Sequence, residues 1–307
     1  MTHQELWQEL GCQQRPKEIW QKPFDYDPAH YERLCKRCET DARFPANDDP
    51  VDLEYYLEDL TWVKETQPDL LLFLLPLCLR AWSFNLLSGT EFFAGYAEWF
   101  WLPWNKGNPM HGSLFELLSK KQRHAFERYV SEAIVEAIDR APALKSGAGP
   151  QTYCFGWFRE LGSFATVYPG LPQLWHNWWN LETGGRAIGA LQYISCLMYE
   201  DTDNPIFTLW TTGLGGGLPR LWEDAMSVND QPWDPENVRF LKEVLVPERL
   251  LVAIDRSLER LTNAEDRQIA AQMKSDFASQ RTLLELRIEQ LLVILSSAGH
   301  GLAKWII

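Results

Sequence analysis

The chain has 307 residues, of which 46% are hydrophobic and 23% are charged, so a packed core is expected and a wholly disordered protein is excluded. Acidic residues outnumber basic ones by 42 to 29, which gives a formal net charge of −13. That balance argues against direct nucleic-acid binding, because phosphate contacts need clustered Lys and Arg. An acidic surface favours solubility and attracts basic partners.

The first residues and the most apolar run predict the location of the protein. Residues 1–5 show no basic region followed by an apolar stretch, so no signal peptide is expected. The most apolar run, residues 70–79, is too short to span a bilayer and is closed by Arg80. We therefore expect a cytoplasmic protein with reduced cysteines and no membrane segment.

An all-α fold is predicted, with two adjoining helical lobes and a long C-terminal helix. Residues 1–50 are polar and contain aromatic anchors, which predicts an N-terminal arm packed on the body. Residues 51–141 are predicted to form the first lobe. Within it, residues 68–87 are apolar nearly all round and predict a buried helix that Pro76 kinks or divides. Residues 119–140 carry apolar side chains at intervals of three and four and predict the clearest helix.

Residues 152–262 are predicted to form the second lobe. A linker at 141–151, with Pro, Gly and Ser, is expected to precede it. Within this lobe, residues 183–200 show the pattern of an amphipathic helix. Asp234 and Pro235 suit the N-cap and the first position of a further helix.

Residues 263–307 are predicted to form one long helix, over 263–298, and a tail. The first half of the helix is polar and is expected to be solvated. The second half carries a series of apolar residues from Leu283 to Leu295. We expect this half to dock on the body of the protein or on a partner.

Tryptophan is unusually frequent, with fifteen copies. Trp buries a large area and is enriched at binding interfaces, although core packing is its commoner fate. Two clusters with His and Asn nearby are candidates for binding a partner or a ligand. The candidate residues are Trp99, Trp101, Trp104, Trp175, His176, Trp178 and Trp179.

Cys35 and Cys38 have the spacing of half a zinc site or of a redox pair. A structural zinc site needs four ligands, and no second paired-cysteine segment exists in the sequence, although Cys12 and His30 could complete a set. Two structural thiols on a helix are the simpler interpretation. We therefore expect no cofactor, with zinc as the alternative.

Residues 35–82 and 114–130 resemble a known group of proteins. The first segment has Cys-x-x-Cys followed by LEYYLEDLTWV and LLLFLLPLCLRAW, and the second is LFELLSKKQRHAFERYV. Together they resemble small, uncharacterised helical bacterial proteins with a paired-cysteine segment and an aromatic-Leu-Pro helix. The resemblance implies a helical bacterial protein, and the group has no established activity to carry over.

Two functional hypotheses remain. No Gly-x-Ser-x-Gly or His-Glu-x-x-His motif occurs, and no catalytic residue is assigned. The first hypothesis is a non-catalytic protein-interaction module, such as an immunity or adaptor protein, whose acidic surface binds a basic partner protein. The alternative is an enzyme or small-ligand binder with a Trp-lined pocket between the lobes.

Overall fold

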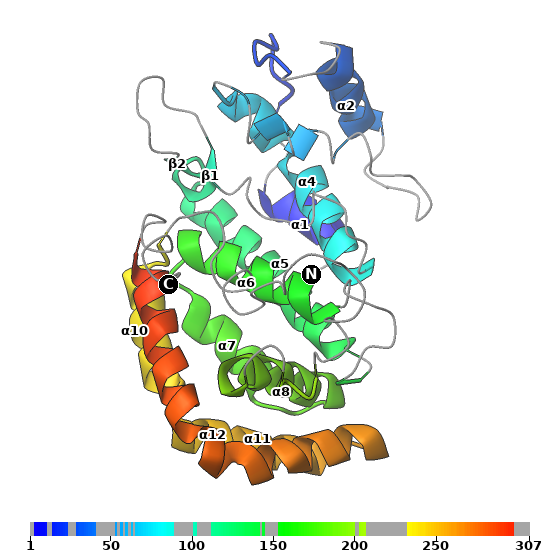
Figure 1. Cartoon of the computed structure of the whole chain (residues 1–307). Helices are drawn as coiled ribbons and strands as arrows, with labels where there is room; N and C mark the ends of the chain where they lie inside the picture. Colours follow the sequence, from blue (N-terminus) through cyan, green and yellow to red (C-terminus); the bar gives the residue numbers. More distant parts are fainter. Residues whose placement is uncertain are drawn as a thin grey trace, which may run out of the picture. The chain divides into compact units, whose positions relative to one another are not determined.

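The computed structural model is all-α and multi-helical, as predicted (Figure 1). It describes residues 3–10, 14–23, 29–40, 53, 56–57, 59–60, 63, 65–88, 101–102, 112–141, 143–144, 153–199, 203–206 and 232–297. The helices of these residues are α1 (His3–Leu10), α2 (Ala29–Thr40), α4 (Pro68–Ser88), α5 (Lys120–Asp139), α6 (Tyr153–Val167), α7 (Leu171–Trp179), α8 (Gly184–Met198), α10 (Pro235–Val244), α11 (Pro247–Arg260) and α12 (Ala264–Ser296).

One small sheet accompanies the helices. Strands β1 (Trp101–Leu102) and β2 (Gly112–Ser113) pair antiparallel, with Trp101 opposite Ser113. A single 3-10 turn, Leu114–Glu116, follows β2.

The chain divides into two compact units, Met1–Ala133 and Ile134–Ile307. The division falls inside α5, whereas the sequence suggested a linker at 141–151. The finer division into an arm (1–50), two lobes (51–141 and 152–262) and a C-terminal part (263–307) stays a prediction.

Helix α4 forms the core of the first unit. Pro76 lies inside it, and the helix continues unbroken from Pro68 to Ser88. Of the two predicted effects of Pro76, division of the helix is therefore wrong, and a kink stays a prediction. α1 and α2 both pack against it. α4 is long and apolar enough to cross a membrane, but 78% of that stretch is buried inside the protein, and a buried core helix meets the same criteria.

Gln67, just before α4, is hydrogen-bonded to residues 18–21 within the first unit. Its side-chain oxygen accepts from the backbone N–H groups of Trp20 and Gln21, at 2.8 and 3.1 Å, and its amide nitrogen donates to the Glu18 carbonyl at 2.8 Å. The Gln67 N–H in turn donates to the Gln21 side chain at 2.8 Å. Both glutamines are buried, so these bonds are shielded from competing water.

Helix α5 begins where the sequence predicted. The Ser119 N–H donates to the Gln122 side chain at 2.9 Å, and the Gln122 N–H donates to the Ser119 hydroxyl at 3.4 Å. This reciprocal pair satisfies two donors that the first turn leaves unpaired. The predicted helix over 119–140 is confirmed.

Helix α8 is the centre of the second unit. The sequence predicted an amphipathic helix, but nearly every residue of α8 is buried, because α7, α11 and α12 all pack around it. Two glycines let it approach the end of α5. A Cβ added at Gly185 would lie 2.3 Å from the Asp139 carbonyl oxygen, and one at Gly189 would lie 2.8 Å from Ile138.

Helices α10, α11 and α12 complete the second unit. The Asp234 side chain caps α10 by accepting from the Glu236 N–H at 2.9 Å, which confirms the predicted helix start. Figure 1 shows α12 beside α11 along its first half and beside α10 along its second half. Arg287, which is buried, donates to the carbonyls of Cys196 and Tyr199 at the end of α8. α12 is thereby fixed to the centre of the unit.

Candidate functional site

Two of the predicted binding residues, Trp175 and Trp178, lie in an aromatic core. They are 1% and 0% exposed. The Trp178 ring meets the Trp157 ring of α6 edge to face at 5.1 Å, and the Trp175 ring meets that of Tyr193 of α8 at 5.3 Å. Burial raises the pKa of Tyr193 far above its ordinary value. These rings pack the second unit together.

His176 and Trp179, which lie on α7 together with Trp175 and Trp178, reach the surface. Trp179 is partly buried and stacks on Trp175, with ring centroids 4.9 Å apart. His176 is exposed, and its ring lies 5.8 Å from that of Phe240. The four residues that the sequence grouped together therefore separate into a buried pair and a surface pair.

Trp179 lines a shallow depression of about 350 Å³ within the second unit. Val252 and Arg256 of α11 form part of its wall. The Arg256 guanidinium donates to the Asn180 carbonyl at 2.6 Å, which ties α11 to the turn after α7. An aromatic face beside a guanidinium group is suited to a planar ligand that carries a negative charge.

The first tryptophan cluster lies largely outside the described residues. Trp99 and Trp104 are not among them, and Trp101 is described only in its backbone, as part of β1. Its role in binding stays a prediction.

The paired cysteines face the core of the first unit. Cys35 and Cys38 are buried, and the Cys38 thiol donates to the Phe73 carbonyl of α4 at 3.7 Å. Cys78, also buried, has its pKa raised by desolvation. Among the described residues no three His, Cys, Asp or Glu side chains are grouped to hold a metal, and Cys12 lies outside them.

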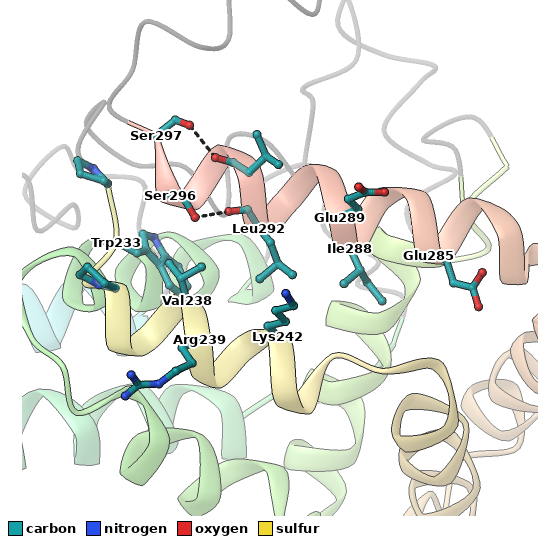
Figure 2. Close-up of a pocket in the computed structure, with 13 residues that line it drawn as sticks. Trp233, Val238, Arg239, Lys242, Glu285, Ile288, Glu289, Leu292, Ser296 and Ser297 are labelled. Carbon is teal, nitrogen blue, oxygen red and sulfur yellow. Dashed lines mark hydrogen bonds between the residues drawn. The ribbon is translucent and has the colours of Figure 1, made fainter.

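In the second unit, a groove with a volume of about 990 Å³ lies between α10 and the second half of α12. Figure 2 shows Val238 and Lys242 of α10 pointing toward Ile288 and Leu292 of α12. Trp233 lies near Ser296, at the end of the groove where α12 ends. The groove therefore has an apolar floor built from two helices.

The helix that forms one wall of the groove is firmly anchored. The Asn237 side chain of α10 donates to the carbonyls of Ala165 and Tyr168, at 2.8 and 2.6 Å, and accepts from the Leu171 N–H at 3.2 Å. At the end of the groove, the backbone N–H of Trp233 donates to the Leu295 carbonyl at 2.8 Å. The Asn237 bonds hold α10 to the residues between α6 and α7, and the Trp233 bond joins the segment before α10 to the end of α12, so the groove is preformed.

The two rims of the groove carry opposite charge. On α10, Arg239 pairs with Glu236 at 3.3 Å, and on α12, Glu285 pairs with Arg281 at 2.9 Å. Lys242 and Glu289 also line the groove, and neither has an ion-pair partner among the described residues. One cation and one anion are therefore available to a bound segment.

The sequence did not reveal this groove. Val238, Ile288 and Leu292 look like ordinary members of amphipathic helices, because the pairing of α10 with α12 brings together residues some 50 positions apart. One signal was present. The change of α12 from polar to apolar near Leu283 predicted that its second half docks on something.

Protein-family models, curated proteins and solved structures were compared with the chain, and none matches it.

Proposed function

We propose that the protein is a non-catalytic interaction module that binds a segment of another protein in the groove between α10 and α12. The observation that carries this proposal is the groove itself, with its apolar floor and its two rims of opposite charge. Grooves of this kind receive amphipathic segments, whose apolar side chains enter the floor and whose polar side chains remain at the rims. The proposed binding needs no cofactor.

The exposure of the groove's lining residues and the volume of the groove favour a protein partner over a compact ligand. Trp233 and Ile288 are buried beneath it, while Val293 at its rim is 49% exposed. A volume of about 990 Å³ is at the upper end of the range for small-ligand sites. Several apolar side chains of one segment would fill it.

The charge of the chain favours a basic partner. With a net charge of −13, the protein attracts a positively charged protein over distances of about a Debye length, ~8 Å at physiological salt. In the groove, a Lys or Arg of the partner would pair with Glu289. An immunity or adaptor protein acting on a basic partner in the bacterial cytoplasm is the biological form of this proposal.

Native mass spectrometry of the tagged protein, isolated gently from its host's lysate, tests the proposal. Wild type is expected to carry a stoichiometric protein partner. Val293→Asp places a charge in the groove and is expected to lose that partner. Val252→Asp, on α11, is the matched control, because Val252 is 56% exposed and lies outside the groove, and it is expected to keep the partner.

Two outcomes would overturn the proposal. One is the absence of any stoichiometric partner, and the other is a partner that survives Val293→Asp but is lost from Val252→Asp. Far-UV circular dichroism and urea unfolding of each variant establish that the substitutions leave the fold intact.

The depression at Trp179 supports a second candidate function, the binding of a small anionic planar molecule. A stacked Trp179 beside Arg256 is the observation that favours it. In the same spectra, this function predicts a small added mass on wild type that Val252→Asp removes and Val293→Asp keeps. A bare protein mass in every sample contradicts it.

A further inference from the structure

The groove between α10 and α12 opens beside the point where α12 ends. Ser296 is the last helical residue and Ser297 is the cap, and both line the groove. Residues 298–307 therefore begin at the rim of the groove. Any conformation of these ten residues begins within reach of Trp233 and Leu292.

The sequence of residues 298–307 matches the groove chemically. It is Ala-Gly-His-Gly-Leu-Ala-Lys-Trp-Ile-Ile, with two glycines first and then apolar residues around a single cation, Lys304. Glycine adopts the backbone angles that a chain reversal needs. Leu302, Trp305 and Ile306 suit the apolar floor, and Lys304 suits Glu289, which has no ion-pair partner in the part of the chain that the structure describes.

The segment is long enough to cover the groove. The groove follows α12 from Ser297 back to Glu285, twelve residues, or about 18 Å of helix at 1.5 Å per residue. Ten extended residues span about 33 Å. A reversal at the glycines therefore leaves enough chain to reach Glu289.

Trp233 provides a separate indication that another segment reaches this end of the groove. It is 4% exposed, and its indole N–H has no acceptor among the described residues. An unpaired buried donor is destabilising, so an acceptor from a neighbouring segment is favoured. A backbone carbonyl of residues 298–307 would satisfy it.

We propose that residues 298–307 fold back into the groove and occupy it in cis, so that they compete with the partner protein. This inference rests on the proposed function and adds its regulation. For a short linker the effective concentration is about 1 mM, so a segment with a Kd of about 100 µM in trans would fill the groove ~90% of the time. Partner binding would then be weakened by about tenfold.

A labelled synthetic peptide of residues 298–307 tests this occupancy by fluorescence anisotropy. The chain truncated after Ser297 is expected to bind it with a Kd of about 100 µM or tighter, and the full chain at least tenfold more weakly, because its groove is already filled. Within the truncated chain, Val293→Asp is expected to abolish binding and Val252→Asp to preserve it. A peptide with Trp305→Ala is expected to bind at least tenfold more weakly.

Several results would overturn the inference. Equal binding to the full and truncated chains would show that the groove is not filled by this segment, and peptide binding to neither chain would show that the groove does not accept it. Competition by a peptide of residues 207–231, with none by 298–307, would assign the groove to that other segment. A dimer of the full chain that Val293→Asp dissociates would assign it to a second copy.

A second measurement covers the case in which the truncated chain does not fold. In the full chain, Trp305→Asp is expected to increase amide hydrogen exchange in residues 285–297 and to leave residues 248–260 unchanged. Unchanged exchange in 285–297 contradicts the inference. Its failure is distinct from that of the proposed function, because partner binding sensitive to Val293→Asp can persist when the peptide does not compete.

Discussion

Two adjacent glycines at the start of α8 are predicted to respond in opposite ways to the same substitution. A Cβ at Gly185 would lie 2.3 Å from the Asp139 carbonyl oxygen and 2.7 Å from its Cα, whereas the nearest atom to one at Gly184 is the Arg260 oxygen at 4.0 Å. Ordinary contact begins at 3.4 Å, so Gly185→Ala requires a shift of about 1 Å between two backbones. Gly184→Ala requires no shift.

The end of α5 cannot yield easily at that point. The Asp139 carboxylate accepts from the Arg186 guanidinium at two positions, each at 3.0 Å, and from the Thr183 hydroxyl at 2.5 Å. Displacing the helix would therefore disturb a bidentate ion pair that is partly buried. We expect Gly185→Ala to lower the free energy of unfolding by about 3 kcal/mol.

Gly184→Ala is expected to be neutral or to stabilise by up to about 1 kcal/mol, because alanine loses less backbone entropy on folding. At about 2–4 °C per kcal/mol for a unit of this size, Gly185→Ala should lower Tm by roughly 6–12 °C. Urea unfolding followed by far-UV circular dichroism measures both variants against wild type. If Gly185→Ala proved as stable as Gly184→Ala, the close packing of α8 on α5 would be refuted.

Three further predictions follow from buried polar groups. Gln67→Ala should cost about 2–4 kcal/mol in urea unfolding, because it leaves buried backbone groups unpaired; a loss below ~0.5 kcal/mol would contradict the bonding described. Desolvation raises the pKa of Asp266, although the Leu144 N–H donates to its carboxylate at 2.9 Å. The stability that Asp266 contributes is therefore present below about pH 4 and is lost as the pH rises through the folded-state pKa of Asp266. Asp266→Asn keeps an acceptor for Leu144 and should gain stability relative to wild type at pH 7 more than at pH 4, whereas an equal difference at both pH values would refute this. Cys78, whose raised pKa follows from burial, should react with iodoacetamide at pH 8 about 100-fold more slowly in the native protein than in urea, as read by mass spectrometry of its peptide, and similar rates in the two states would disprove that burial.

Local signals in the sequence were sufficient to predict where α5 and α10 begin. Ser119 and Gln122 form the reciprocal bonds that begin α5, and Asp234 caps α10, because capping depends on residues within one turn. The all-α class was predicted from apolar side chains that recur at intervals of three and four residues. Pro76 does not divide α4, because packing of the helix among buried neighbours outweighs the loss of one helical hydrogen bond.

Features set by distant residues could not be predicted. The sequence of α8 suggests an exposed face, but α11 and α12, which follow it by some fifty residues and more, cover that face. Arg287 looks like a solvent-facing residue of α12 and is instead buried at the end of α8. Trp175 and Trp178 could not be separated from Trp179 by composition, since only the position of α7 decides which rings face the core.

The central claim is that the groove between α10 and α12 is the surface that binds a partner. Hydrogen–deuterium exchange of the protein with and without its isolated partner tests this claim most directly. Slower exchange in residues 235–244 and 285–297, with no change in residues 248–260, is the predicted result. Protection confined to residues 248–260, or lying wholly in the first unit, would contradict the account.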